Sequence, residues 1–171
     1  MIKCFVTFFG VGLIRPASGT WGSLAGAIVG YFILKFLGAS ALFGISFLIF
    51  LISINIINNY EKTVQSHDNS EIVIDEAVGV WIAMSISCAF VFGKNGDILE
   101  GQFYILSIIL SFIYFRAFDI LKPSIIGKID REVKGGLGVM LDDVLAGFFA
   151  GIGVLMTLGI IFKLGYTKIL F

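Results

Sequence analysis

The amino-acid sequence predicts an all-α, helical integral membrane protein with about five membrane-embedded helices and a polar site on its cytoplasmic face. Hydrophobic residues make up 58% of the 171 residues and charged residues only 14%, whereas a soluble domain needs more charged and polar side chains to cover its surface. The mean hydropathy of +1.00 indicates the same class. Neither strand periodicity nor an internal repeat competes with a helical interpretation. We expect a single domain over residues 1–171.

Charge balance and cysteine content exclude several classes of function. The 12 basic and 12 acidic residues give a formal net charge of zero, so no global field favours a nucleic-acid partner. Cys4 and Cys88 lie in separate apolar runs without a paired spacing, which is not typical of a disulfide framework or a zinc site. The lipid bilayer is therefore the partner that composition indicates.

The first apolar segment of the chain, residues 4–14, is too short to cross a bilayer, which takes about 20 helical residues. We expect it to be a re-entrant or interfacial segment, ended by the turn at residues 15–20. Thr20 closes this turn just before the first full-length apolar run. Its default role is that of a helix N-cap.

Five longer apolar runs follow, and each is expected to form a membrane-embedded helix. The first is rich in glycine and alanine, so we expect it to pack closely on a neighbouring helix. Polar residues from Asn58 onward end the second. The third carries Asp75 and Glu76 one turn inside it, and the fifth begins directly after Asp142 and Asp143. The five runs cover residues 21–37, 41–57, 72–92, 102–115 and 144–162.

The distribution of lysine and arginine predicts how these helices are oriented. With the N-terminus in the cytoplasm, eight basic residues fall on the cytoplasmic side: Lys3, Arg15, Lys62, Arg116, Lys122, Lys128, Arg131 and Lys134. The opposite side receives four: Lys35, Lys94, Lys163 and Lys168. Trp21, Tyr60 and Trp81 are expected to be interfacial aromatics. All polar segments then lie on the cytoplasmic face.

Two acidic pairs are the strongest candidates for chemistry. Asp75-Glu76 and Asp142-Asp143 each lie at the expected cytoplasmic start of an apolar helix, and carboxylates so close to hydrocarbon are costly unless they are paired or bind a cation. Two facing pairs would supply the hard oxygen ligands that Mg²⁺ prefers. Each acid alone could instead cap its helix, because negative charge favours the positive end of the helix dipole.

The stretch from residue 116 to residue 143 is the most highly charged part of the chain. Arg116, Asp119 and Lys122 are spaced so that Asp119 lies beside both basic neighbours on a helical surface. This spacing is typical of an ordinary row of salt bridges. It also suits a basic phosphate site in which Asp119 orients Arg116 or Lys122.

A second mixture of charges, Asp130, Arg131 and Lys134, precedes the glycine pair Gly135-Gly136. These glycines leave backbone N–H groups unobstructed ahead of a helix N-terminus, which suits an anion. A turn between two helices would use glycine as well.

Familiar schemes for phosphate chemistry are not matched. A cysteine-dependent phosphatase needs an arginine soon after its cysteine, and neither cysteine has one. A type 2 phosphatidate phosphatase needs two histidines, whereas His67 is the only one and is by default part of a solvated loop. The acid- and glycine-rich signature of the CDP-alcohol phosphotransferases is missing as well.

Three pieces of the sequence resemble the phosphatidylglycerophosphatase A family, in that family's order and spacing. The third piece is the most specific. The family commonly has proline where this chain has Ser18, a change that affects the stiffness of a turn more than its chemistry. The pieces are residues 12–25 (GLIRPASGTWGSLA), residues 67–82 (HDNSEIVIDEAVGVWI), and residues 115–123 (FRAFDILKP) followed by residues 130–147 (DREVKGGLGVMLDDVLAG).

The resemblance implies a multi-pass enzyme of the bacterial cytoplasmic (inner) membrane that removes the terminal phosphate of phosphatidylglycerol phosphate with Mg²⁺ in phospholipid biosynthesis. The expected catalytic residues are Asp75, Glu76, Asp119, Asp130, Asp142, Asp143 and His67. The expected substrate-binding residues are Thr20, Arg116, Lys122, Arg131, Lys134, Gly135 and Gly136. The expected Mg²⁺ ligands are Asp75, Glu76, Asp142 and Asp143.

Other mechanisms and functions stay open at this point. Hydrolysis by a metal-activated water is expected, and a phospho-aspartate intermediate is the competing mechanism. A small ion-coupled transporter or channel subunit would also use intramembrane acids as cation ligands, but it predicts acids deep within the spans. A phosphatase that acts on another lipid phosphate is a third interpretation.

Overall fold

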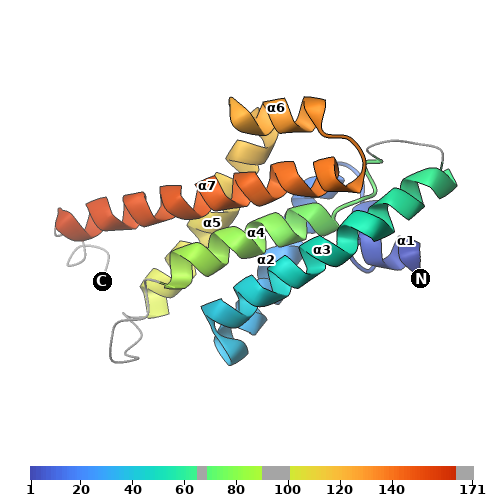
Figure 1. Cartoon of the computed structure of the whole chain (residues 1–171). Helices are drawn as coiled ribbons and strands as arrows, with labels where there is room; N and C mark the ends of the chain where they lie inside the picture. Colours follow the sequence, from blue (N-terminus) through green and yellow to red (C-terminus); the bar gives the residue numbers. More distant parts are fainter. Residues whose placement is uncertain (65–68, 90–100, 165–171) are drawn as a thin grey trace.

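The computed structural model describes residues 1–64, 69–89 and 101–164, and their regular structure is entirely helical (Figure 1). The elements are α1 (Ile2–Val6), the 3-10 helix η1 (Val11–Leu13), α2 (Ser18–Leu37), α3 (Ala39–Val64), α4 (Ile74–Ala89), α5 (Gly101–Leu121), α6 (Ile125–Glu132) and α7 (Gly136–Lys163). The predicted segment at residues 4–14 falls in α1 and η1, which are too short to cross a membrane.

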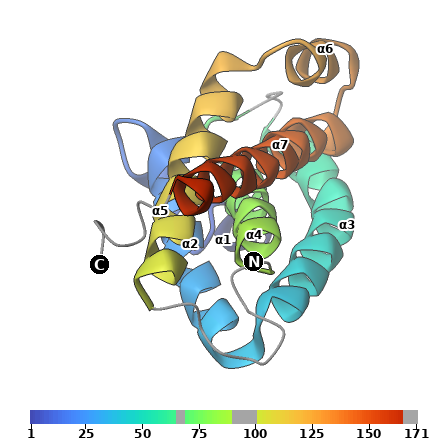
Figure 2. The ribbon, with the colours of Figure 1, turned by 90° about the vertical axis from the view of Figure 1, so that its left-hand side faces the viewer.

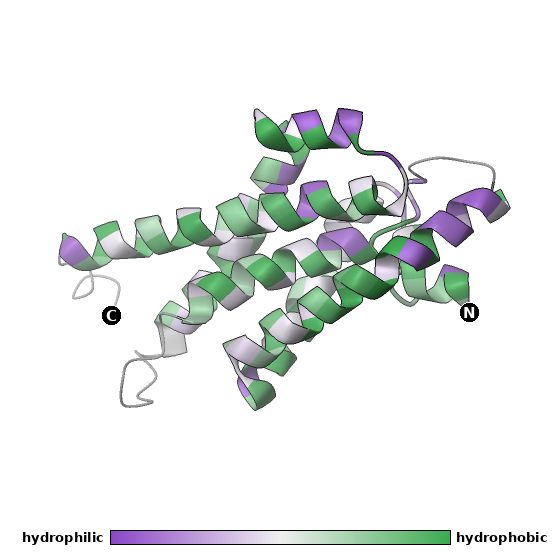
Figure 3. Ribbon diagram, viewed as in Figure 1, coloured by the Kyte–Doolittle hydropathy of each residue, from purple (hydrophilic) through white to green (hydrophobic). Residues whose placement is uncertain are grey.

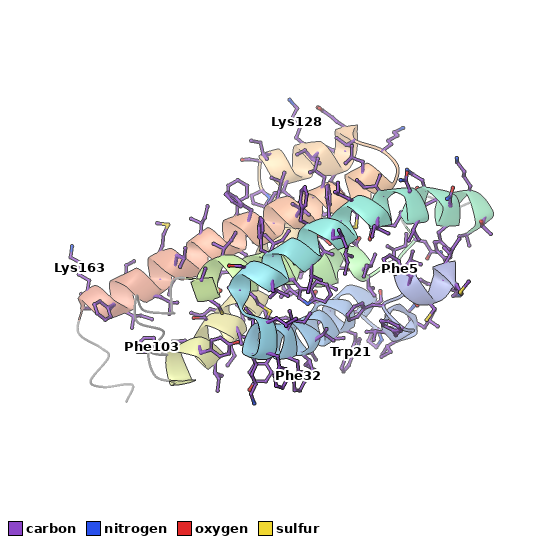
Figure 4. All side chains as sticks on the ribbon, turned by 60° about the horizontal axis from the view of Figure 1, so that its bottom comes forward. Phe5, Trp21, Phe32, Phe103, Lys128 and Lys163 are labelled. Carbon is purple, nitrogen blue, oxygen red and sulfur yellow. The ribbon has the colours of Figure 1, made fainter. Side chains whose placement is uncertain are left out.

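Four helices of the described part are long and apolar enough to span a membrane: Ser18–Leu37, Ala39–Val64, Phe103–Leu121 and Gly136–Lys163. Their outward faces carry large apolar side chains, such as Phe32 of α2, which Figure 4 shows pointing away from the bundle. The prediction of an all-α membrane protein is confirmed.

The expected third helix, the run 72–92, contains α4. The described part of this run includes all 16 residues of α4, Ile74–Ala89, and residues 90–92 lie outside the described part. Figure 2 shows α4 at the centre of the bundle, where it contacts α2, α3, α5 and α7. It is apolar because it is the core helix of the protein.

Small residues on α2 bring that helix close to α4, as the glycine content predicted. A Cβ at Gly22 would lie 2.6 Å from the Cβ of Val73, and one at Gly30 would lie 2.7 Å from Cδ1 of Trp81. Trp81 is 3% exposed, and its Nε1 donates to the carbonyl of Gly26 at 2.6 Å. Its predicted interfacial position is therefore wrong.

The other two aromatic residues that were expected at the membrane interface differ from each other. Tyr60 is buried, and its hydroxyl donates to Oε2 of Glu71 at 3.1 Å, so it belongs to the core. Trp21 is 43% exposed and points outward from α2 (Figure 4), as an interfacial residue does.

Two helices extend further into the charged stretch than the apolar runs indicated. Helix α5 continues to Leu121 and so carries Arg116 and Asp119. Helix α7 begins at Gly136, which places Asp142 and Asp143 about two turns inside it. These charged residues can lie within helices because they form ion pairs or line a cavity. Hydropathy does not detect such pairing, so the predicted apolar runs were shorter than the helices.

Hydrophilic residues gather at one end of the bundle. Figure 3 shows them on α6, on the end of α3 and on the first turns of α4 and α7. Lys35 and Lys163 lie instead in the last turns of α2 and α7. Figure 4 shows Lys163 at the opposite end of the molecule from Phe5. Lys94 and Lys168, the other basic residues expected on that side, lie outside the described residues.

Candidate active site

A cavity of about 410 Å³ opens at the polar end of the bundle. Five segments that are far apart in the sequence form its walls: the starts of α2 and α4, the end of α5, helix α6 and the first turns of α7. Its charged lining consists of Asp75, Glu76, Arg116, Asp119, Lys122, Asp130, Asp142 and Asp143, and its other lining residues are Ser18, Gly19, Asn69, Ser70, Ile72, Val133, Gly138 and Val139.

Three of these acids form a compact cluster. Asp75 and Glu76 from the first turn of α4 and Asp143 from α7 each offer a carboxylate oxygen, and these oxygens lie within 4.8 Å of one another. The close contact of α4 with α7 explains their proximity. Gly79 and Gly147 each follow an acid of the cluster by one turn, and a Cβ at Gly147 would lie 2.9 Å from the carbonyl carbon of Gly79.

The cluster fits a divalent cation. Asp75 and Asp143 are 8% and 4% exposed, and Oε2 of Glu76 is buried without a hydrogen-bond partner among the described residues. Three carboxylates that are this close repel one another unless a cation or protons neutralise them. Oxygen ligands of this kind are those that Mg²⁺ prefers. The fourth predicted ligand, Asp142, lies beside the cluster rather than within it.

Asp142 is engaged by a lysine. Its Oδ2 accepts a hydrogen bond from Nζ of Lys122 at 2.8 Å, while its Oδ1 is buried and has no partner in the described part of the chain. Lys122 also forms an ion pair with Asp130 of α6. Burial alone would lower the pKa of Lys122, but the hydrogen bonds to Asp130 and Asp142 raise it above its usual value. Lys122 is therefore a protonated side chain on the cavity wall.

Arg116 is held from two helices. Its Nη1 pairs with Asp119 one turn further along α5, and its Nη2 donates to Oγ1 of Thr20 on α2 at 3.3 Å. The prediction that Asp119 accompanies both basic residues holds for Arg116, whereas Lys122 turns to Asp130 and Asp142. Thr20 is not the N-cap of α2, because that helix begins at Ser18.

The glycine pair before α7 has a structural explanation. The backbone N–H of Gly136 donates to Oδ1 of Asn58 on α3 at 2.7 Å, and a Cβ at Gly136 would lie 3.0 Å from the carbonyl carbon of Ile54. Gly135 has a φ of +75° at the N-cap position. These glycines allow α3 to pack closely against the start of α7. Gly138, and neither Gly135 nor Gly136, belongs to the cavity lining.

Two further predicted residues lie away from the described cavity wall, and a third cannot be placed against it. Arg131 and Lys134 are exposed, and neither belongs to the cavity lining. His67 lies outside the described residues.

The structure adds cavity residues that hydropathy and charge did not single out. Ser18 donates through Oγ to the carbonyl of Ser70 at 2.6 Å, which fixes the segment before α4 against the start of α2. A Cβ at Gly19 would collide with Oε1 of Glu76 and lie 3.4 Å from Nη1 of Arg116. The sequence offered one signal for these two cavity residues: both are small and lie where the first long helix begins. Small residues there allow charged groups to approach the backbone.

Comparisons with known proteins identify the relatives of this chain. A family model described as phosphatidylglycerophosphatase A matches residues 4–158. The phosphatidylglycerophosphatase A of Haemophilus influenzae is 40% identical over 146 residues, which cover 85% of this chain and 82% of that protein. The Escherichia coli protein of the same name is 32% identical over 157 residues, covering 92% and 83% of the two chains.

A third relative has a different name. A Bacteroides thetaiotaomicron protein, provisionally named phosphatidylinositol-3-phosphatase, is 34% identical over 149 residues, covering 84% of this chain and 85% of its own. No solved structure shows a significant match to the chain. The family match covers far more than half of the residues, and two relatives above 30% identity share the family's name. The chain therefore belongs to the phosphatidylglycerophosphatase A family.

Proposed function

We propose that this protein is a Mg²⁺-dependent phosphatidylglycerophosphatase that hydrolyses phosphatidylglycerol phosphate to phosphatidylglycerol and inorganic phosphate. The observation that carries the proposal is one cavity, at the polar end of an apolar bundle, that is lined by three clustered carboxylates and by two cations, Arg116 and Lys122. Two of the carboxylates, Asp75 and Asp143, are buried. A lipid phosphate held at a membrane surface presents its headgroup at such a position. The family membership supplies the reaction.

In this proposal Asp75, Glu76 and Asp143 hold the metal ion, with Asp142 beside them as the fourth expected ligand. When bound, Mg²⁺ polarises phosphoryl oxygens and lowers the pKa of a bound water. The carboxylates are on helices that pack closely through Gly79 and Gly147, so their separation is fixed before substrate arrives.

Arg116 and Lys122 are the proposed phosphate-binding groups. A guanidinium presents a planar fork of N–H donors that matches phosphate oxygens, and Asp119 and Thr20 hold the fork of Arg116 in place. Lys122 supplies a second positive charge, positioned by Asp130 and Asp142. Both cations stabilise the negative charge on the phosphoryl group during transfer.

Direct attack of water is proposed for the chemical step, and a phospho-aspartate intermediate is the competitor. The stereochemistry at a chiral phosphorus atom separates the two mechanisms. A single in-line displacement inverts the configuration of an isotopically chiral substrate, whereas two successive displacements retain it. We expect inversion, and retention would establish the covalent route.

We further propose that the enzyme works in phospholipid biosynthesis in the bacterial cytoplasmic membrane, with the cavity on the cytoplasmic face. The basic residues described at the cavity end outnumber those at the other end, as the positive-inside rule requires. Labelling of single cysteines at Asn69 and at the exposed Lys128 with an impermeant reagent tests this orientation. Both positions should react only when the reagent has access to the cytoplasmic side.

A second candidate substrate is another lipid phosphate. The Bacteroides thetaiotaomicron relative, named for a phosphoinositide, supports this candidate. An ion-coupled transporter is less well supported, because the acids lie near one end of the bundle beside two cations. Side-by-side assays of the purified protein on phosphatidylglycerol phosphate, phosphatidylinositol 3-phosphate and phosphatidic acid decide the question. The proposal requires the highest kcat/KM on the first.

A further inference from the structure

We propose that Arg15 binds the phosphodiester that stays on the lipid, while the phosphomonoester that is removed enters the cavity. This inference rests on the proposed function, because it concerns how the same site selects its substrate. A phosphatidyl headgroup that carries a further phosphate has two anions, an outer monoester and an inner diester. Arg116 and Lys122 serve the outer one, so the inner one needs a cation at the rim of the cavity.

Arg15 lies at that rim. Its side chain is exposed, and its Nη2 donates to Oγ of Ser70 at 3.1 Å. Ser70 is part of the cavity lining. Ser18, also a lining residue, donates to the carbonyl of Ser70 at 2.6 Å. Two hydrogen bonds therefore fix the turn that carries Arg15 against the wall of the cavity.

The guanidinium of Arg15 has donors to offer a phosphate. Arginine carries five N–H donors, and the bond to Ser70 uses one of them. The nearby carboxylate of Glu71 is engaged elsewhere, since its Oε2 lies 3.0 Å from Nζ of Lys3 and 3.1 Å from the hydroxyl of Tyr60. Arg15 therefore stands beside the cavity without a dedicated ion pair to Glu71.

The surroundings of Arg15 match the order of groups in a lipid. Leu13 and Ile14, which precede it, are 49% and 44% exposed, and Trp21 points outward from the start of α2 (Figure 4). Exposed apolar side chains adjoin Arg15 in the sequence, and its partner Ser70 lines the charged cavity. These neighbours match the acyl chains and the outer phosphate, between which the inner phosphodiester of the lipid lies. Lys128 and Arg131 of α6 and Lys134 just after it do not contribute to the cavity lining.

The test compares inhibition constants of purified variants in mixed micelles. Phosphatidylglycerol carries the inner phosphate alone, and inorganic phosphate mimics the outer one. In Arg15→Gln, the KM for phosphatidylglycerol phosphate and the inhibition constant of phosphatidylglycerol should both rise about tenfold. The kcat and the inhibition constant of inorganic phosphate should stay near the wild-type values. Lys163→Gln, at the far end of α7, should change none of these.

Two outcomes overturn the assignment. A rise in the inhibition constant of inorganic phosphate alone would place Arg15 on the outer phosphate, and four unchanged constants would remove it from substrate binding. If the melting temperature shows that Arg15→Gln does not fold, Arg15→Lys provides the same comparison, with smaller rises in the same two constants, because lysine keeps the charge and loses the fork. Failure of the proposed function is distinct, because the wild-type protein would then release no phosphate.

Discussion

Nζ of Lys122 lies 2.8 Å from Oδ2 of Asp142 and also pairs with Asp130, so one ammonium group joins the end of α5 to α6 and to α7. The two carboxylates neutralise and position the lysine at the cavity wall. Because the pKa of Lys122 is raised by these contacts, its positive charge is present when the phosphate binds.

Replacement of this charge should impair catalysis strongly. Lys122→Gln is expected to lower kcat by about 10²- to 10³-fold, the usual cost of removing one group that stabilises transition-state charge. Lys128→Gln, at an exposed position on α6 (Figure 4), is the matched control and should retain activity. Equal losses in both variants would mean that general positive charge matters, and not this contact.

The planar guanidinium group of Arg116 should contribute to activity as much as its charge does. Arg116→Lys keeps the charge but cannot maintain separate bonds to Asp119 and Thr20, so kcat/KM should fall by roughly 10- to 100-fold. Thr20→Val, which removes one of the two supports, should give a smaller loss. A Lys variant with wild-type kcat/KM would show that only the charge of Arg116 is used.

Gly19 should tolerate no side chain. A methyl group there would collide with Oε1 of Glu76 and approach Nη1 of Arg116, so Gly19→Ala is expected to reduce activity by at least roughly tenfold through displacement of these groups. Gly44→Ala is the control, because a Cβ at Gly44 would meet no atom within 4 Å. Unchanged activity in Gly19→Ala would show that Glu76 and Arg116 have room to shift.

The sequence contained enough to predict most of the fold. Long apolar runs predicted α2, α3, α5 and α7, because membrane spans need continuous hydrophobicity that few other structures require. The run at residues 72–92 predicted α4 too, but not its central position, since a helix surrounded by four others is as apolar as one that faces lipid. Hydropathy registers removal from water and does not distinguish protein from hydrocarbon around the helix.

The site was predictable as a set of charges and less so as a set of contacts. Because carboxylates are costly near hydrocarbon, the positions of Asp75, Glu76 and Asp143 beside apolar runs were enough to indicate a cation site. Asp142, which is not part of this cluster, contacts Lys122 just beyond the end of α5. Sequence spacing along one helix does not include such contacts between helices.

The central position of α4 predicts an asymmetry in stability between two methionines. Met84 on α4 is fully buried and Met156 on α7 is 65% exposed. Met84→Ala should cost about 2–5 kcal/mol because it leaves a cavity among packed helices, whereas Met156→Ala should change little. Melting temperatures in the same detergent measure the difference. Similar losses in both variants would contradict the assignment of α4 as a core helix.

The central claim is that the three-carboxylate cluster supports Mg²⁺-dependent removal of phosphate from a lipid. The most direct measurement is phosphate release from phosphatidylglycerol phosphate by the purified protein, after chelation and after return of Mg²⁺, for the wild type, Asp75→Asn and Asp143→Asn. We predict release by the wild type that chelation abolishes and Mg²⁺ restores, and a loss of at least about 10³-fold in both variants. Activity that survives chelation, or that persists in both variants, would contradict the account.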